Sequence, residues 1–266
     1  MIGLLPQPPV DQPLDPTGQT VLTIATSVVA LGFVLFTVRL CRQRRTWAPA
    51  LLMASGVLCL VLEPVYDDQF HIWFHDRGQM WGTYSAYGMT QPVWVPITYA
   101  WCYGGLALLV WRRLVTGMTR SGLLRMTGML LAIFTVFELV GINLGVYTYF
   151  GDHPFRLFGL PIWVEIPNTV LTVVAAVAFA RLEPVLRGFG RAALLAVVPA
   201  AFAMLSFGAA FPTLVVISEA GRPTALVYAA TMISLALSVA MLHLAVQAVP
   251  TSAPTPDRAL DTVEVS

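Results

Sequence analysis

The chain has few charged residues and no lysine. Of its 266 residues, 11% are charged and 57% are hydrophobic, and all 15 basic residues are arginine. A soluble domain usually carries about 25% charged residues. This chain therefore has too little charge to cover a water-facing surface, which excludes a soluble globular enzyme. A retinal Schiff base, a pyridoxal site and a P-loop are also excluded, because each requires a lysine side chain.

Net positive charge and cysteine are also scarce. The formal net charge is only +1, which gives no basic field for nucleic acid, so we expect no nucleic-acid partner. The three cysteines, Cys41, Cys59 and Cys102, lie far apart in or beside apolar runs and form no CxxC motif. We expect them to be inert, buried thiols.

Long apolar runs dominate the rest of the chain. A helix needs about 17–25 apolar residues to cross a hydrocarbon core of about 30 Å. Runs of that length recur at 20–38, 48–66, 92–111, 123–143, 161–180, 191–217 and 223–247. The sequence therefore predicts an all-α, polytopic membrane protein with seven transmembrane helices in the lipid bilayer. We expect an extracytoplasmic N-terminal segment (1–19), a transmembrane domain (20–248) and a disordered cytoplasmic tail (249–266).

The positions of the arginines predict the orientation. Twelve of them fall at one set of helix ends, and only Arg77, Arg156 and Arg222 fall at the opposite set. Cytoplasmic loops carry an excess of basic residues. The N-terminus is therefore expected outside the cell membrane and the C-terminus in the cytoplasm.

A short segment occurs twice in the chain. Residues 92–97 read Pro-Val-Trp-Val-Pro-Ile, and residues 161–166 read Pro-Ile-Trp-Val-Glu-Ile. Each copy follows an aromatic–glycine turn and, further upstream, a helix that ends near a glutamate. These features are Tyr87-Gly88 and Glu63 for the first copy, and Phe158-Gly159 and Glu138 for the second. The pattern predicts an internal repeat in which the second and third helices match the fourth and fifth.

The carboxylates at membrane depth are predicted to lie at one level. Glu63 and Glu138 lie near the outer ends of outward-running helices, Asp67 lies just above, and Glu165 lies one turn inside an inward-running helix. Charged groups cost roughly 2–3.5 kcal/mol at the membrane core and less near the interface, so these should face the bundle interior or water. Asn168 shares the helical face of Glu165.

Helical spacing predicts three faces that point inward. They consist of Trp94, Thr98, Trp101 and Gly105 on the third helix, Glu138, Gly141 and Gly145 on the fourth, and Glu165, Asn168, Thr169 and Thr172 on the fifth. We predict that they enclose a cavity in which carboxylates meet aromatic rings. The residues expected to bind substrate are Tyr66, Trp94, Trp101, Tyr147, Tyr149, Trp163 and Asn168, with Tyr99 beside them. Alternatively, the aromatic residues form the interfacial belts of a membrane protein, which occur regardless of function.

Carboxylic acids beside aromatic rings suit one type of reaction. A protonated acid in an apolar pocket can protonate an olefin or an epoxide, and ring faces stabilise the resulting carbocation by cation–π attraction. The lipophilic small-molecule substrate would be an isoprenoid, and ring closure or water addition would follow without a cofactor. Glu63 or Glu138 would donate the proton. The other of these two, Glu165 or Asp67 would orient the donor or take the final proton.

A resemblance to known families supports this chemistry. The stretch from Glu138 to Gly151, continuing at Phe158-Gly-Leu-Pro-Ile-Trp-Val, resembles a segment of the membrane carotenoid hydratases. The seven-helix size and a glutamate on the second helix are similar to the membrane-integral terpene cyclases. Both resemblances imply acid-initiated isoprenoid chemistry, and Glu63 would correspond to the cyclase acid. The cyclases also use an acidic residue on a late helix, where this chain has only Glu219 and His243.

A metal site is a further hypothesis. Asp67, His71 and His75 are spaced i, i+4 and i+8 and would share one face of a helix. Two histidines and a carboxylate bind iron or zinc in many enzymes. The run from Asp67 to His71 is also similar to aspartate-rich diphosphate motifs, but only Arg77 is nearby as a cation. The favoured interpretation is that these loop residues are solvated and bind no metal.

The alternative function is proton-coupled transport or non-catalytic binding of a small molecule. Carboxylates inside a helix bundle form proton relays, and transporters often contain repeats and broken helices. Pro64, Pro96 and Pro167 are the candidates for helix breaks. Two parallel repeats differ from the usual inverted repeats of transporters, so the sequence favours an enzyme.

Overall fold

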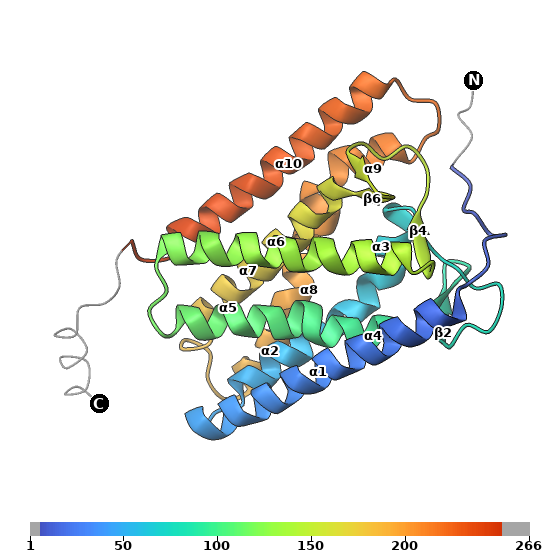
Figure 1. Ribbon diagram of the computed structural model, residues 1–266. Helices are drawn as coiled ribbons and strands as arrows, with labels where there is room; N and C mark the ends of the chain where they lie inside the picture. Colours follow the sequence, from blue (N-terminus) through green and yellow to red (C-terminus); the bar gives the residue numbers. More distant parts are fainter. Residues whose placement is uncertain (1–5, 252–266) are drawn as a thin grey trace, which may run out of the picture.

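Seven helical spans form the body of the protein. The structure is a computed structural model and describes residues 6–251. The helices long and apolar enough to cross a membrane are Pro16–Arg44, Ala48–Gln69, Trp94–Leu114, Arg120–Asn143, Ile162–Leu182, Gly188–Ala209 and Thr224–Gln247. They confirm the predicted all-α, polytopic membrane fold (Figure 1). Most of the predicted tail, 252–266, lies outside the described residues.

Three spans are single α-helices, and the other four combine helical segments of different types. The single helices are α1 (Pro16–Arg44), α6 (Arg120–Asn143) and α10 (Thr224–Gln247). The second span is α2 (Ala48–Leu58), the 3₁₀ turn η1 (Cys59–Leu62) and α3 (Glu63–Gln69). The third is α4 (Trp94–Tyr99), the π-helical η2 (Ala100–Gly105) and α5 (Leu106–Leu114). The fifth is the 3₁₀ turn η3 (Ile162–Val164) and α7 (Glu165–Leu182). The sixth is the 3₁₀ segment η4 (Gly188–Ala196), α8 (Val197–Phe202) and the π-helical η5 (Ala203–Ala209), followed by the short α9 (Phe211–Ile217).

Two predicted helix boundaries were wrong, and the residues at the observed helix ends explain both differences. The first helix begins at Pro16 rather than at residue 20, because the Asp15 carboxylate accepts a hydrogen bond from the Thr17 backbone N–H at 2.8 Å and proline suits the first helical turn. The predicted sixth helix, 191–217, is two helices. Pro212 lies in the first turn of α9, where it has no N–H to continue the preceding helix.

The three prolines suggested as helix breakers all lie in the first turn of an α-helical segment. Pro64 is the second residue of α3, which begins directly after the 3₁₀ turn of the second span. Pro96 lies in the first turn of α4 and Pro167 in the first turn of α7, where a missing N–H breaks no helical hydrogen bond. The π-helical interruptions of the third and sixth spans therefore begin away from these prolines.

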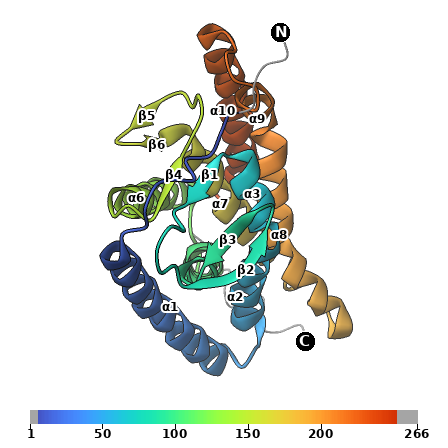
Figure 2. The same cartoon turned by 90° about the vertical axis from the view of Figure 1, so that its right-hand side faces the viewer.

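Short strands cover one end of the bundle (Figure 2). They are β1 (Ile72–Phe74), β2 (Gly82–Ala86), β3 (Met89–Pro92), β4 (Tyr147–Tyr149), β5 (Arg156–Leu157) and β6 (Leu160–Pro161), and they form the antiparallel pairs β1–β4, β2–β3 and β5–β6. The two aromatic–glycine turns close the hairpins. Tyr87 and Gly88 have φ values of 51° and 75°, and Phe158 and Gly159 have 48° and 88°. Two consecutive left-handed residues are the geometry of a type I′ hairpin turn.

The two halves of the predicted repeat share one order of elements: a span, a strand, a hairpin and a second span. The strands of the two halves pair with each other, with Trp73 opposite Thr148 and Ile72 opposite Tyr149. The offset of 75 positions that relates Glu63 to Glu138 also relates Trp73 to Thr148. The ladder is therefore centred on equivalent residues, as a local two-fold axis requires, and this supports the repeat.

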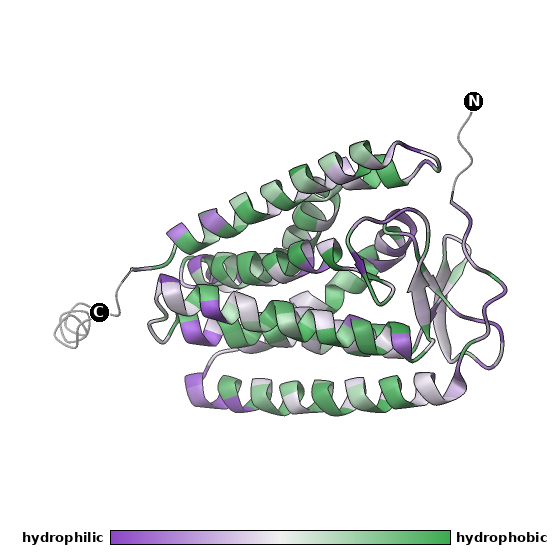
Figure 3. Ribbon diagram, turned by 45° about the horizontal axis from the view of Figure 1, so that its top comes forward, coloured by the Kyte–Doolittle hydropathy of each residue, from purple (hydrophilic) through white to green (hydrophobic). Residues whose placement is uncertain are grey.

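The third and fifth spans form the centre of the bundle. In the most apolar stretch of each of these two spans, 78% of the residues are buried. The corresponding share is only 17% for α1, 22% for α6 and 28% for α10. Apolar residues, coloured green, continue along the length of the outer helices (Figure 3). A surface this apolar is stable against lipid chains rather than water, so the outer helices contact the bilayer.

Glycines set the contact between the second and third spans. A Cβ atom added at Gly104 would lie 2.6 Å from the carbonyl oxygen of Met53, and one added at Gly56 would lie 2.9 Å from the carbonyl carbon of Tyr103. Small residues let helix backbones approach closely in a membrane, where association depends on packing. The side chains of Cys102 and Tyr103 are consequently held at a fixed distance from the second span.

Gly104→Ala should destabilise the protein by about 1–3 kcal/mol, because the added methyl group has no room against the Met53 backbone. Thermal unfolding in detergent measures the effect. Gly128→Ala on α6 is the matched control, since a Cβ there would meet nothing within 4 Å. Equal unfolding temperatures for the two variants would contradict this packing argument.

The two ends of the bundle differ in charge. Among the described residues, Arg77, Arg156 and Arg222 lie at the strand-rich end, and the other eleven arginines lie at the opposite, arginine-rich end. The remaining one, Arg258, is outside the described residues. The positive-inside rule accordingly predicts that the strand-rich end faces outward.

Cysteine labelling tests this orientation. Tyr87 at the strand-rich end and Val185 at the arginine-rich end are 68% and 72% exposed. In a variant whose three native cysteines are alanine, a membrane-impermeant maleimide should label Tyr87→Cys on intact cells. It should label Val185→Cys only after the membrane is permeabilised. The reverse pattern would show that the predicted orientation is wrong.

Candidate functional site

Three carboxyl groups, from two segments of the chain, line one small cavity inside the bundle, which we call the acid chamber. It has a volume of about 50 Å³ and is enclosed by the second, third, fourth and fifth spans together with β1 and β4. Its polar lining includes Glu63, Asp67, Glu138 and Asn168. Its aromatic lining consists of Tyr66, Phe74, Trp94, Tyr99, Tyr103, Phe134, Phe137 and Tyr147.

Glu63 lies where the second span changes from a 3₁₀ turn to α3, next to Pro64. Its side chain is buried, and its Oε2 accepts a hydrogen bond from the hydroxyl of Tyr99 on α4. The glutamate predicted on the second helix is therefore tied to the third span by a neutral donor. One face of the chamber is built from this contact.

Asp67 lies one turn further along α3 and is fully buried. Its Oδ2 accepts a hydrogen bond of 2.7 Å from the side-chain amide of Gln91 on β3, while its Oδ1 has no hydrogen-bond partner among the described residues. Gln91 was not predicted from the sequence, because it lies in a hairpin outside the helical faces. One oxygen of Asp67 thus remains available to a bound molecule.

Glu138, near the end of α6, receives two hydroxyl groups on the same oxygen. Its Oε2 accepts hydrogen bonds from Tyr147 at 2.8 Å and from Tyr149 at 3.1 Å, both on β4. Gly141 makes room for this arrangement, since a Cβ atom there would lie 2.7 Å from the Tyr147 hydroxyl. The inward face at Gly141 therefore contacts a strand residue, Tyr147 of β4.

Gly145 departs further from the predicted inward face. Helix α6 ends at Asn143, and Gly145 has a φ of 65°, so it lies beyond the helix in a left-handed conformation. Its carbonyl oxygen lies 3.0 Å from Nδ1 of His75. The prediction that Gly145 shares the inward face of the fourth helix was wrong, because the helical spacing was extended past the residue at which the helix ends.

Asn168 and Glu165 lie on α7, but only Asn168 lines the acid chamber. The Asn168 side chain is hydrogen-bonded to the hydroxyls of Tyr66, at 3.1 Å, and Tyr103, at 3.2 Å. Glu165 is fully buried, and neither of its side-chain oxygens has a partner among the described residues. It lies within electrostatic range of Glu138, so it belongs to the surroundings of the chamber rather than to its lining.

The third span presents a different face from the one predicted. Trp94 and Thr98 line the chamber as expected, whereas Trp101 faces an apolar groove on the other side of Phe137. The wider turn of the π-helical η2 changes which side chains follow Thr98 on the inner face. Cys102 and Tyr103 take the positions that a regular α-helix would have given to other residues.

Trp163 and Tyr149 stand just behind the chamber lining. Trp163 stacks on Phe70 with ring centroids 5.5 Å apart, and Phe70 stacks in turn on Tyr66 at 4.1 Å. Tyr149 reaches Glu138 through its hydroxyl without lining the cavity. These two predicted binding residues therefore support the residues that line the chamber.

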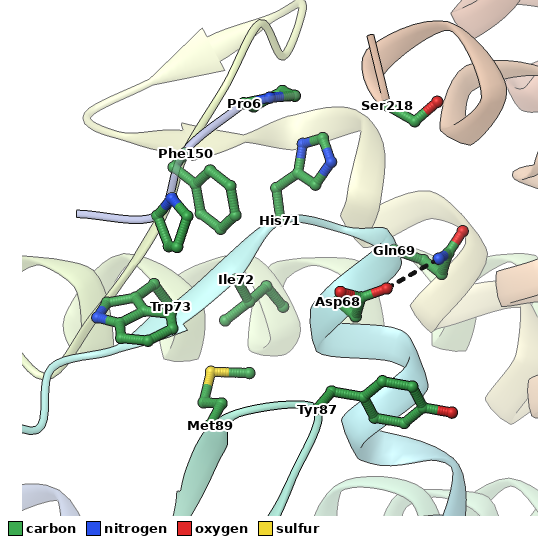
Figure 4. Close-up of a pocket in the computed structure, with 11 residues that line it drawn as sticks. Pro6, Asp68, Gln69, His71, Ile72, Trp73, Tyr87, Met89, Phe150 and Ser218 are labelled. Atoms are coloured by element: carbon green, nitrogen blue, oxygen red, sulfur yellow. Dashed lines mark hydrogen bonds between the residues drawn. The ribbon is translucent and has the colours of Figure 1, made fainter. Parts of the chain in front are cut away.

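A second cavity of about 280 Å³, the outer pocket, lies at the strand-rich end (Figure 4). It is lined by Pro6, Pro8, Asp68, Gln69, His71, Ile72, Trp73, Tyr87, Met89, Phe150 and Ser218. Figure 4 shows Ile72 near the middle of this group, with His71 and Phe150 on one side and Met89 on the other. Ile72 also lines the acid chamber, so this one side chain stands between the two cavities.

The structure separates the three residues of the metal hypothesis. Helix α3 ends at Gln69, and His71 has a φ of 51°, so Asp67, His71 and His75 do not share a helical face. Within residues 6–251, no group of three or more His, Cys, Asp or Glu side chains is placed to hold a metal ion. Burial lowers the pKa of His71 and of His75.

The three cysteines are free thiols in the structure. Cys59 and Cys102 are buried, as predicted, whereas Cys41 is partly exposed. The Cys102 side chain lines the acid chamber beside Tyr99 and Tyr103. Its position was not predicted, because the sequence carries no sign of the π-helical turn that brings Cys102 to the inner face.

Comparison with protein-family models, curated proteins and solved structures finds no match to this chain.

His153 is a buried titratable group behind the chamber, and it makes stability depend on pH. Its ring stacks on Trp163 at 6.2 Å and meets Tyr149 and His71 edge-on, each at 5.8 Å. Burial lowers the pKa of His153 well below its ordinary value, and the positive charge of Arg156 acts in the same direction. Below about pH 6.5 the unfolded chain therefore binds a proton that the folded chain does not.

The wild-type protein should lose stability as the pH falls from about 7.5 to about 5, by up to about 1.4 kcal/mol per pH unit for each such histidine. His153→Gln should reduce this loss, leaving the smaller contributions of His71 and His75. Thermal unfolding in detergent at the two pH values measures it. His243→Gln, at an exposed position of α10, is the control, and an unchanged pH dependence in His153→Gln would contradict the prediction.

Proposed function

We propose that this chain is a membrane-embedded enzyme that carries out acid-initiated cyclisation or hydration of a lipophilic isoprenoid. The observation that carries the proposal is the convergence of Glu63, Asp67 and Glu138 on one cavity walled by aromatic rings. Protonation of an olefin or epoxide requires an acid beside the double bond or oxygen, and the cation that follows requires electron-rich surroundings. Both requirements are met by side chains lining the same space.

The roles of the carboxyl groups follow from their hydrogen bonds. Glu138 receives two hydroxyl donors on one oxygen, which suits a group that accepts the final proton. Glu63 receives one donor, from Tyr99. The chamber lining, as far as the structure describes it, includes no arginine or histidine, and several negative charges without a cation would be costly. The proposal therefore requires one carboxyl group to carry a proton, and we assign that role to Glu63, with Asp67 orienting the substrate or a water.

Aromatic rings surround the position that a carbocation would occupy. Tyr66, Tyr99 and Tyr103 all line the chamber, and the ring centroids of Tyr99 and Tyr103 are 5.0 Å apart. The rings of Trp94 and Tyr147, which also line it, are in contact, with centroids 5.6 Å apart. Desolvated cation–π contacts contribute about 2 kcal/mol or more each. Such walls lower the free energy of a cationic intermediate.

The volume of the acid chamber limits what occupies it in this conformation. A cavity of about 50 Å³ holds a few water molecules, which hydration would consume, but an isoprenoid needs more room. Substrate binding therefore requires side chains of the lining to move. The aromatic residues toward the lipid-facing side, such as Phe137, are free of hydrogen bonds that would oppose such a movement, because phenylalanine has no polar atoms.

Proton-coupled transport is the second candidate, and the small cavity is the observation that favours it. Waters between Glu63, Asp67 and Glu138 would form a relay, and Ile72 lines both the chamber and the outer pocket. Carboxyl groups arranged in this way conduct protons in pumps and transporters.

Glu63→Gln and Glu138→Gln should each lower turnover of prenylated or polyene substrates by about 10²–10⁴-fold, because amides neither donate nor accept the required proton. Purified protein in detergent or nanodiscs is incubated with these substrates, and the products are identified by mass spectrometry. Glu183→Gln at the arginine-rich end of α7 is the control for removing a carboxylate outside the chamber.

Full turnover in both chamber variants would rule out the assigned roles. Substrate-driven or pH-driven flux across liposomes, with no change in the covalent structure of the substrate, would replace the proposed enzyme with a transporter. Elemental analysis of the purified protein and treatment with a chelator test whether a metal takes part.

A further inference from the structure

An apolar groove lies on the lipid-facing surface between α1 and α6. Its volume is about 500 Å³, within the range of about 300–1,000 Å³ typical of small-molecule sites. Trp101 of the third span lines it, and its sides are formed by Leu22, Ala25, Thr26 and Val29 of α1 and by Met129, Ala132, Ile133, Val136, Phe137 and Val140 of α6. Apart from Thr26, the indole of Trp101 and the thioether of Met129, its lining side chains are hydrocarbon.

The groove results from the way in which α1 and α6 diverge. At the strand-rich end they touch, since a Cβ atom on Gly18 would lie 3.1 Å from the Cβ of Leu144, and the Asp15 N–H donates to the Gly145 carbonyl at 3.3 Å. Away from that contact, α1 packs on α4 and η2, while α6 packs on α7. The two helices consequently separate along their length (Figures 1 and 2), and the groove is closed at its strand-rich end.

Phe137 connects the groove to the acid chamber. Its side chain lines both spaces, and its ring meets Trp101 edge-to-face with centroids 5.2 Å apart. The groove has about ten times the volume of the chamber, at about 500 Å³ against about 50 Å³. A rotation of one uncharged side chain would join a space large enough for a hydrocarbon chain to the space that holds the carboxyl groups.

We propose that this groove binds the polyprenyl chain of the isoprenoid substrate and delivers its reactive end to the acid chamber past Phe137. The inference rests on the proposed function and specifies the route and the chain-binding site. A substrate dissolved in the bilayer reaches this groove without crossing water, whereas the outer pocket opens among polar residues such as Asp68 and Gln69. The hydrocarbon lining selects the chain, and the aromatic pair Trp101–Phe137 presents ring surfaces to its double bonds.

Photocrosslinking in nanodiscs tests the groove independently of turnover. The probe is a diazirine derivative of geranylgeraniol, and crosslinked peptides are mapped by mass spectrometry on the full chain. Crosslinks should concentrate on residues 22–29 and 129–140 and should be displaced by unlabelled geranylgeraniol. Ala25→Trp and Ala132→Trp fill the groove and should lower crosslinking by about tenfold.

Matched tryptophan substitutions outside the groove are the controls. Val28 on α1 and Leu124 on α6 are 65% and 51% exposed and do not line the groove, so Val28→Trp and Leu124→Trp should leave crosslinking unchanged. Labelling spread evenly over the lipid-facing helices, or unaffected by Ala25→Trp and Ala132→Trp, would overturn the inference. Equal labelling by a diazirine fatty acid that geranylgeraniol does not displace would also overturn it, because the groove would then hold ordinary lipid.

The same experiment separates this inference from the proposed function. Glu63→Gln should retain the crosslinks, since the groove lies outside the chamber. Displaceable groove crosslinks without any product from the wild-type protein would refute the enzymatic proposal while supporting the prenyl-binding groove. Product formation that persists in Ala25→Trp and Ala132→Trp would place the route elsewhere.

Discussion

Carboxyl groups placed inside the bundle without a cationic partner are the constraint on which this protein's interior depends. In the part of the chain that the structure describes, each carboxyl group lining the acid chamber is bonded by a neutral donor: Glu63 by Tyr99, Asp67 by Gln91, and Glu138 by Tyr147 and Tyr149. An arginine would hold a carboxylate in its charged form, whereas a tyrosine hydroxyl both donates and accepts. Neutral partners therefore leave each acid able to gain or lose a proton without losing its position.

The number of spans and the depth of a residue within its span could be predicted from the sequence. The side of the helix that a residue faces could not be predicted where the helix is irregular. The seven spans follow from apolar length, and the shared level of Glu63 and Glu138 follows from their distance to helix ends. Trp101 was misplaced because a helical wheel assumes a constant number of residues per turn, which η2 does not keep. Gln91 was missed because a hairpin carries no periodic signal that points at Asp67. The functional roles of these residues stay predictions.

The repeat explains why the chamber has its acids where it does. The two copies share a frame, but the counterpart of Asp67 is Ile142 and the counterpart of Glu165 is Pro96. The first copy thus supplies Glu63 and Asp67 to the chamber from one span, whereas the second supplies Glu138 to the chamber and Glu165 to its surroundings. A duplicated scaffold with unlike polar residues places carboxyl groups on several sides of one space, and a single unit could not surround a substrate in this way.

The β1–β4 ladder has a mechanical consequence for the two glutamates. Glu63 and Glu138 each lie nine residues before the strand that follows their helix, and those strands are hydrogen-bonded to each other. The β1–β4 ladder therefore links the two chain segments that carry these acids at the strand-rich end. Alternating access would need the two halves to move apart around a central site. Here that movement would have to break the hydrogen bonds between β1 and β4. The β1–β4 ladder therefore favours an enzyme, in which the two acids stay in place around the substrate, over a transporter that moves the substrate across the membrane.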